Sequence, residues 1–480
     1  MMSLLAACNT KKENNSNSDK NNDQQTKTTT QETTTEEEES TIVITVLTDK
    51  ERLVNTKFAE YKSIFEADQE NVVVQFEAVK NYEQEVEKRL KSGDYGDVLL
   101  IPDSVEDEKL AQYFEPLGTV EELSESYNEM YLQERAVDGV VYGLPRYVNV
   151  HGVAYNEVVF AKAGVVELPK TPGEFLSALK KIENTQLGVI PYYTGYQNGE
   201  WLWQWQSHAW GSVSGNGDYR NNAIVTEQEP FAQETPNYIV HELLHDIVKN
   251  GLCETYVEGE NWKPLFRLMN RGDIGSMMLS SEYLHDLQVA DVNPDDISFM
   301  PFPYSIDGQQ YASVEPDYCY AVNKNSENKE TAKAWIEYML KDSGYAKSEG
   351  AISIKKKAAL PDVLSNFKGV EFVVNNAATK ENVGKYEELN ELSGIYLDKD
   401  IEKNRLILSA LGETEESFGD IMDDWNLRWR AALQGIRYAE ENDTQEDEEE
   451  KNSTSGIPSA VKMTPEYLQF LEDIRSDIEQ

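Results

Sequence analysis

Residues 42–47 have the sequence Ile-Val-Ile-Thr-Val-Leu, a short run of mostly β-branched side chains that favours a β-strand. Apolar side chains recur at near-helical spacing over residues 52–67, and a second strand-like run, Val-Val-Val-Gln-Phe, occupies residues 72–76. A polar helical segment over residues 82–91 precedes a third strand-like run, Asp-Val-Leu-Leu-Ile, at residues 97–101. Alternating strands and helices are typical of a parallel sheet covered by helices, so this stretch predicts an α/β fold.

Polar residues follow the first and third predicted strands, at the sheet edge where open parallel sheets bind their ligands. Asp49 lies just beyond the first strand, and Asp103 just beyond the third. An isolated Asp in such a position is commonly a helix cap or a turn residue. Because both carboxylates are predicted at one edge, a ligand-binding role stands beside that structural one.

The length and charge of the chain limit what it can be. Its 480 residues exceed what one hydrophobic core usually supports, so we expect two or more domains. The 44 basic and 87 acidic residues give a formal net charge of −43, which excludes nucleic acid as a natural partner. The same charge argues against docking on anionic lipid through the protein surface. The sequence has no apolar run of about 18 residues, so we predict no membrane-spanning helix.

The acidic residues are unevenly distributed. Residues 9–40 carry a charge of −4 and contain no aromatic or aliphatic side chain, which is typical of a disordered tether. Residues 440–451 carry −7, and we predict a final helix after them. The remaining −32 belongs to the folded body, which is compatible with neutral or cationic ligands but identifies none.

A series of longer motifs runs through the middle of the chain. Residues 142–156 are Tyr-Gly-Leu-Pro-Arg-Tyr-Val-Asn-Val-His-Gly-Val-Ala-Tyr-Asn, followed by Lys-Ala-Gly at 162–164. Further along are Gly-Asp-Ile-Gly-Ser-Met-Met at 272–278, Phe-Pro at 302–303, Ala-Val-Asn-Lys-Asn-Ser at 321–326 and a helical segment at 332–340. In this order they resemble the extracellular solute-binding proteins of ABC importers, over residues 41–360.

This resemblance implies a periplasmic-binding-protein-like fold, in which two α/β lobes are joined by a multi-strand hinge and hold a solute between them. Lobe one would comprise residues 41–148 and 309–345, and lobe two residues 149–308 and 346–438. Residues 1–8 would be the remainder of a signal sequence and residues 9–40 the tether. Residues 439–480, an acidic segment and a C-terminal helix, lie outside the resemblance.

Aromatic residues are concentrated in residues 192–210, and four of the eight Trp residues lie within residues 201–210. Helical spacing would place Trp201 and Trp205 on one buried face. Alternatively, at least one ring faces the cleft, where a sugar could stack on it. The resemblance to sugar-binding members aligns Trp201, Tyr283 and the hinge residue Asn149 with ligand contacts. The complete set of predicted ligand-binding residues is Asp49, Asp103, Asn149, Trp201, Trp203, Tyr283 and Asp317.

The cysteines point to lipidation rather than to disulfides. Residues 4–8, Leu-Leu-Ala-Ala-Cys, resemble a bacterial lipobox in which Cys8 carries the lipid, and the polar tether behind it favours this interpretation over a chance sequence. Only three Cys residues occur, so we expect no disulfide framework. A bridge between Cys253 and Cys319 is an alternative that nothing in the sequence supports, and we predict two buried thiols.

Residues 241–245, His-Glu-Leu-Leu-His, form a complete H-E-x-x-H motif, which can hold zinc when it lies on a helix. The predicted helix spans residues 236–251, and both His residues lie at the flank of its apolar stripe, where solvated or capping His is common. The third ligand of the extended metzincin motif is missing. We therefore predict no metal site, and a zinc metallopeptidase is only a remote alternative.

Together these features predict a lipoprotein on the extracytoplasmic face of the cell membrane. It would capture a sugar or oligosaccharide between its lobes and deliver it to the membrane permease of an ABC importer. We expect a monomer that is not an enzyme, uses no cofactor and meets the membrane only through its lipid. The alternative ligand is a polyamine or another cationic solute, because the acidic body and the aromatic residues could attract a cation.

Overall fold

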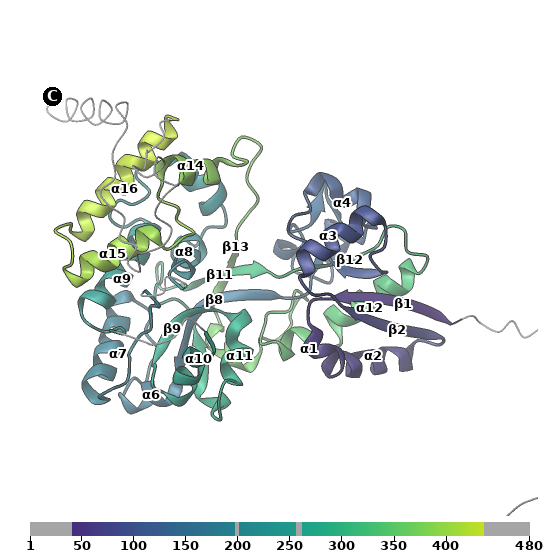
Figure 1. Cartoon of the computed structure of the whole chain (residues 1–480), viewed down its shortest axis with the longest axis horizontal. Helices are drawn as coiled ribbons and strands as arrows, with labels where there is room; N and C mark the ends of the chain where they lie inside the picture. The colour runs from purple at the N-terminus through teal and green to yellow at the C-terminus, as the bar shows by residue number, and fades with distance from the viewer. Residues whose placement is uncertain (1–40, 197–200, 256–261, 436–480) are drawn as a thin grey trace, which may run out of the picture. The chain divides into compact units, whose positions relative to one another are not determined.

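The computed structural model describes residues 41–196, 201–255 and 262–435, whose helices and strands are shown in Figure 1. These residues belong to one unit, which begins at Thr41. The predicted signal remainder with Cys8, the tether of residues 9–40, and the acidic segment and helix of residues 439–480 lie outside the described residues.

The first sheet has five strands in the order β2-β1-β3-β12-β7. Its strands are β1 (Ile42–Thr48), β2 (Val72–Ala78), β3 (Val98–Leu100), β7 (Leu144–Pro145) and β12 (Cys319–Val322). Strand β1 pairs in parallel with β2 and β3, and helices α2 (Lys57–Asp68) and α3 (Tyr82–Ser92) connect them. The predicted strand–helix–strand order is therefore confirmed, and Asp49 and Asp103 follow the carboxyl ends of β1 and β3 as expected.

The second sheet has the order β10-β8-β11-β13, and β9 also pairs with β8. Its strands are β8 (Val148–Asn156), β9 (Ser276–Ser280), β10 (Ile297–Met300), β11 (Tyr311–Pro316) and β13 (Glu371–Val374). All nine residues of β8 are buried, which is expected of a strand covered on both faces. Strand β8 is antiparallel to β9, β10 and β11, whereas β11 and β13 are parallel.

The chain passes between the two sheets over very short connections. Two residues separate β7 from β8, and two separate β11 from β12. The segment around Ile352 adds a third connection. Ile352 forms a β-bridge with Val148 of β8, and the carbonyl of Ile354 accepts a hydrogen bond from the backbone N–H of Asn128. These connections agree with the predicted multi-strand hinge. The exact division into lobes stays a prediction, but β11 pairs with the second sheet, whereas we expected residues 309–316 in lobe one.

The remaining elements cover the sheets and connect their strands. Helices are α1 (Glu51–Val54), α4 (Asp107–Tyr113), α5 (Val120–Leu123), α6 (Glu157–Lys162), α7 (Pro172–Thr185), α8 (Gln204–Ser207), α9 (Pro236–Lys249), α10 (Trp262–Arg271), α11 (Leu284–Gln288), α12 (Lys329–Lys341), α13 (Tyr345–Ser348), α14 (Lys385–Ser393), α15 (Ile401–Leu411) and α16 (Phe418–Leu433). Short helical turns are η1 (Glu129–Tyr131), η2 (His208–Val213), η3 (Tyr219–Ala223), η4 (Ile224–Thr226), η5 (Ser281–Tyr283), η6 (Pro294–Asp296) and η7 (Asp362–Phe367), of which η2 and η3 are π-helical. Strands β4 (Gly118–Thr119), β5 (Ala136–Val137) and β6 (Val140–Val141) form a small third sheet.

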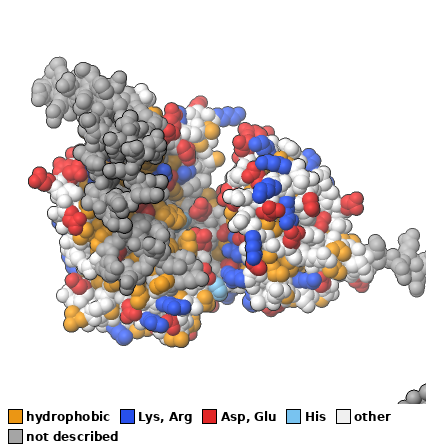
Figure 2. Space-filling view, viewed as in Figure 1, with side chains coloured by type: hydrophobic (Ala, Val, Ile, Leu, Met, Phe, Trp, Pro, Cys, Tyr) orange, Lys and Arg blue, Asp and Glu red, His pale blue; other side chains and the backbone are white. Residues whose placement is uncertain are grey.

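Large aromatic side chains fill the cores. Beside the first sheet, Trp335 of α12 packs edge-on against Phe65 at 5.1 Å between ring centroids. Helices α14 to α16 form a separate apolar cluster around Trp425 and Trp429, and α15 and α16 lie against α9 (Figure 1). Outside these cores, Figure 2 shows Lys and Arg side chains interspersed among Asp and Glu, which limits self-repulsion in so acidic a protein.

We predict that Gly152→Ala destabilises the second sheet. A Cβ at Gly152 would lie 2.6 Å from the carbonyl oxygen of Met300 and 3.0 Å from the ring of Phe299, so backbone or core must shift. Overpacking of this kind costs roughly 1–3 kcal/mol. Urea unfolding of the purified protein measures the free energy of unfolding. Gly173→Ala in α7 is the control, because its Cβ would meet nothing within 4 Å. Equal stability of the two variants would contradict the prediction.

Candidate functional site

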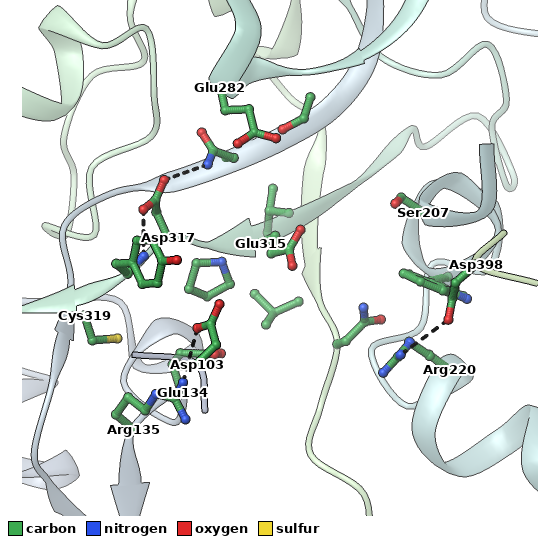
Figure 3. A pocket seen from close by; sticks show the side chains of 18 of the residues that line it. Asp103, Glu134, Arg135, Ser207, Arg220, Glu282, Glu315, Asp317, Cys319 and Asp398 are labelled. Atoms are coloured by element: carbon green, nitrogen blue, oxygen red, sulfur yellow. Dashed lines mark hydrogen bonds and ion pairs between the residues drawn. The ribbon is translucent and has the colours of Figure 1, made fainter. Parts of the chain in front are cut away.

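A cavity of about 690 Å³ is lined by residues from both large sheets and from η2 and η3 (Figure 3). Its charged lining residues are Asp103, Glu134, Arg135, Arg220, Glu282, Glu315, Asp317 and Asp398. In Figure 3, Asp103, Glu134, Arg135 and Asp317 lie on one side, which we call the near end. Arg220 and Asp398 lie on the opposite side, the far end, with Glu315 between the two groups.

A buried guanidinium organises the near end. Arg146, only 4% exposed, donates from Nε to Asp317 Oδ1 at 2.7 Å and from Nη1 to Asp49 Oδ1 at 2.7 Å. Asn149 donates its amide to the other oxygen of Asp317 at 3.1 Å and accepts from the Ser281 hydroxyl at 3.3 Å. Of the predicted ligand contacts, Asp317 and Asn149 line the cavity, whereas Asp49 does not line it and pairs with Arg146.

The position of Asp49 determines its ionisation. Burial acts to raise the pKa of its carboxyl group, but the charge and hydrogen bonds of Arg146 outweigh burial, and the pKa is lowered. Asp49 is therefore a fixed negative charge beneath the near end. It acts on the cavity through Arg146 rather than by direct contact.

Asp103, Glu134 and Arg135 form the rest of the near end. Arg135 lies 3.4 Å from the carboxylate of Asp103 and 3.7 Å from that of Asp107. The carboxylates of Asp103 and Glu134 reach solvent, but the cavity walls displace part of their hydration, and this desolvation raises the pKa of both. Both groups can accept hydrogen bonds from a polar ligand, and Arg135 can donate them.

The middle of the cavity carries Glu282 and Glu315. Glu315 is 75% exposed, and its carboxylate lies 3.5 Å from Nε2 of the buried His151 on β8. The hydrogen bond with His151 lowers the pKa of Glu315, so this carboxylate stays ionised. Desolvation raises the pKa of Glu282, and the negative charge of Asp317 acts in the same direction.

The four clustered Trp residues take different positions. Trp203 lines the cavity and is 37% exposed, and Trp210 also lines it. Trp205 is 1% exposed and belongs to the core. Trp201 does not line the cavity; it packs edge-on against Tyr283 at 5.6 Å, so these two predicted ligand contacts contact each other. Trp201 also approaches Gly195 closely, since a Cβ there would lie 2.8 Å from its ring.

None of the far-end residues Trp210, Arg220 and Asp398 is among the predicted ligand-binding residues. The guanidinium of Arg220 contacts two rings that meet edge-on, and lies 4.7 Å from the centroid of Trp210 and 4.4 Å from that of Tyr386. It is also within 3.8 Å of the carboxylate of Asp398 and 3.7 Å of that of Glu387. These residues come from segments nearly 190 positions apart in the sequence, so no local motif marks them.

The H-E-x-x-H motif lies in α9, as predicted, but its His residues are not solvated. His241 is fully buried and its Nδ1 lies 2.7 Å from the Asn237 carbonyl oxygen, while its ring packs edge-on against Trp425 at 5.2 Å. Burial lowers the pKa of His241 to about 3. His245 is 6% exposed, because Phe418 of α16 covers it. Within the described residues, no three potential ligands come together as a metal site.

The two described cysteines are not bridged. Cys319 is buried as predicted and lines the cavity, whereas Cys253 is only partly buried. Desolvation raises the pKa of Cys253 to about 12 and that of Cys319 well above its usual value, so both side chains remain thiols. Of the helices in the described segments, none combines the length and apolar character that crossing a bilayer requires.

Comparison with known proteins places this fold among binding proteins. Residues 47–346 match the family described as bacterial extracellular solute-binding protein. A curated relative from Brucella abortus, described as a binding protein, is 23% identical over 325 residues, which cover 64% of this chain and 75% of the relative.

Several solved structures have the same fold. A manno-oligosaccharide-specific solute-binding protein from Bifidobacterium animalis subsp. lactis, in complex with mannotriose, is 29% identical with a TM-score of 0.67, covering 82% of this chain and 95% of that one. A second binding protein of that organism, from an ABC transporter and in complex with mannobiose, is also 29% identical, with a TM-score of 0.66, covering 82% of this chain and 95% of that chain. The apo form of RafE from Streptococcus pneumoniae, 20% identical with a TM-score of 0.60, covers 82% of this chain and 98% of its own and supports the fold alone.

We predict that Arg146→Met lowers the free energy of unfolding by about 3–5 kcal/mol, because it leaves two poorly hydrated carboxylates without their cation. Arg271→Met is the matched control: Arg271 is 58% exposed and pairs with Asp291 at the surface, so we expect a loss of about 1 kcal/mol or less. Chemical denaturation at neutral pH measures both. A loss for Arg146→Met no larger than that of the control would show that the buried pairs do not stabilise the hinge.

A second prediction concerns pH. Because the pKa of Asp49 is lowered in the folded protein, its contribution to stability is complete above the unfolded value near 3.8 and is lost as the pH falls through the folded value. Asp49→Asn should therefore lose less stability than the unmodified protein between pH 5 and pH 2.5. Denaturant unfolding across this range gives the two slopes. Parallel slopes would mean that Asp49 has an ordinary pKa.

Proposed function

We propose that this chain, which belongs to the family of bacterial extracellular solute-binding proteins, captures an oligosaccharide in its cavity and delivers it to the membrane subunits of an ABC importer. The observation that carries the proposal is the composition of the cavity wall. An accessible Trp203 ring lies in one cavity with carboxylates, guanidinium groups and the Asn149 amide from separate parts of the chain.

This composition suits a sugar. A pyranose presents a face of C–H groups that can stack on an aromatic ring, and hydroxyl groups at its edge that need hydrogen-bond partners. Carboxylates accept from hydroxyl groups and guanidinium groups donate to them, and such charged hydrogen bonds are about twice as strong as neutral ones. Because Arg146, Arg135 and neighbouring carboxylates hold one another, these partners are already oriented before a ligand arrives.

The predicted site residues divide into two groups under this proposal. Asp103, Asn149, Trp203 and Asp317 line the cavity and would contact the ligand directly. Asp49 would act through Arg146, and Trp201, which packs against Tyr283, would help to position Trp203 two residues further along the chain.

Two Bifidobacterium proteins, solved in complex with mannotriose and mannobiose, suggest a ligand. At 29% identity over most of both chains, they make manno-oligosaccharides the first ligands to test. The proteins at 20% identity or less, which include a raffinose complex of RafE, support the fold and leave the sugar open.

Capture would be a conformational event. The two lobes would close about the three connections between the sheets. One lobe contains residues 41–148 and the later segments of the first sheet, and the other contains residues 149–308 and the C-terminal helices. A ligand bound to both lobes favours the closed arrangement, because only that arrangement contacts it from two sides. We further propose that the protein acts as a monomer outside the cytoplasm, held to the membrane by lipid on Cys8.

The first test is thermal unfolding of the full chain with mannobiose, mannotriose, raffinose and spermidine. A ligand selective for the folded state raises the midpoint, and at one hundred times its Kd the stabilisation is about 2.7 kcal/mol. We expect an upward shift with a manno-oligosaccharide that is insensitive to salt. A salt-sensitive shift with spermidine and none with any saccharide would overturn the proposal.

We predict that Trp203→Ala weakens saccharide binding at least about tenfold, because it removes the accessible aromatic platform of the cavity. Leu187→Ala is the control, since Leu187 is 98% exposed and does not line the cavity. Isothermal titration calorimetry with the saccharide that gives the largest shift measures the change. Unchanged affinity in Trp203→Ala would exclude stacking on this ring.

A further inference from the structure

The far end of the cavity has the features of a separate binding site. Trp210 lies on η2, Arg220 on η3, and Asp398 in the connection between α14 and α15. Figure 3 shows Arg220 and Asp398 facing the near end across the cavity, with Glu315 between. The two ends are therefore distinct groups of polar side chains that share one continuous cavity.

Arg220 is held in one orientation. The rings of Trp210 and Tyr386 lie 4.7 Å and 4.4 Å from its guanidinium carbon, and Asp398 and Glu387 lie within 3.8 Å of Nη2. Its Nη1 donates to the side chain of Asn221 at 2.9 Å. A planar guanidinium fixed by two rings and by carboxylates loses little freedom when it binds a ligand, so the site is preorganised.

Hydrogen-bonding groups at the far end are not all used within the described part of the protein. Nε of Arg220 and Nε1 of Trp210 are shielded donors that have no protein acceptor there, and both residues line the cavity. Buried donors in folded proteins nearly always have an acceptor. Asp398 accepts from the Tyr386 hydroxyl at 3.2 Å through Oδ1.

Part of the far end lies outside the family match, which includes Trp210 and Arg220 but not Asp398. The family match ends at residue 346, and it contains all the near-end residues. Three lining residues of the cavity, Val374, Asn375 and Asp398, lie beyond that limit. Strand β13 and the connection after α14 thus extend the shared binding cavity with residues that the family pattern does not include.

We propose that Arg220, Asp398 and Trp210 form a second saccharide subsite, which binds the end of an oligosaccharide remote from Asp103 and makes the protein selective for longer chains. This rests on the proposed function, since it concerns the same ligand. Arg220 donates to sugar hydroxyl groups and Asp398 accepts from them, while the near end binds the first residues of the sugar. A disaccharide held at the near end leaves the far end without a partner, whereas a longer chain reaches both.

The test is isothermal titration calorimetry of the full chain with mannobiose, mannotriose and mannotetraose. In the unmodified protein the affinity should increase with chain length. Arg220→Met keeps much of the apolar stem but removes the charge. It should reduce the ratio of mannotetraose to mannobiose affinity about tenfold, the usual effect of losing a charged hydrogen bond. Asp398→Asn is a second variant that should reduce the same ratio if Arg220→Met folds poorly.

Arg135→Met is the matched control, because Arg135 lines the same cavity at the near end. It should weaken all three ligands alike and leave the ratio unchanged. If Arg220→Met and Asp398→Asn also weaken all three ligands alike, or none of them, the far-end subsite is wrong while the proposed function stands. If the unmodified protein binds none of the three ligands, the manno-oligosaccharide assignment fails, and the subsite proposal fails with it.

Discussion

The hinge region depends on a single guanidinium. Arg146 lies between β7 and β8, where the chain first passes from one sheet to the other, and Asp317 lies between β11 and β12, where it passes back. Asp49 follows the carboxyl end of β1 in the first sheet. By bonding to both carboxylates, Arg146 connects the two crossing segments to the residue that follows the carboxyl end of β1. Burying one cation is costly, and two paired carboxylates with matched geometry offset that cost.

The same hydrogen bonds hold two residues at the near end of the ligand cavity. Asp317 uses one oxygen for Arg146 and the other for Asn149, and Asn149 is in turn fixed by Ser281. Two of the residues that line the cavity are therefore positioned by the hinge itself. A change in the angle between the sheets would move Asp317 and Asn149 together, which couples the geometry of the binding site to lobe movement.

The parts of the structure that follow local rules could be predicted from the sequence. The alternation of strands and helices from β1 to β3 depends on short-range periodicity, and α9 begins at the Thr235 cap with Pro236 in its first turn. Asp103, Asn149, Trp203 and Asp317 could be proposed from the sequence because strand ends, family motifs and a Trp cluster mark them, and they line the cavity.

The remaining site features depend on contacts between distant segments, which no local pattern contains. Asp49 is at the predicted sheet edge, but its partner Arg146 lies 97 positions away. His241 is buried because α16 brings Trp425 against α9. Helical spacing could not assign Trp201 and Trp203, because α8 begins only at Gln204, after both of them. Arg220 and Asp398 are brought together only by the packing of η3 against α14.

The charge of the cavity bears on the kind of solute it can hold. Six carboxylates against two guanidinium groups would favour a cation if charge alone decided the ligand. However, the two guanidinium groups lie at opposite ends of the cavity, each beside a lining carboxylate. The ammonium groups of a polyamine spanning the cavity would meet a positive charge at both ends. A neutral ligand with many hydroxyl groups meets donors and acceptors at both ends and gains from each, so the position of the charges, rather than their sum, favours a saccharide.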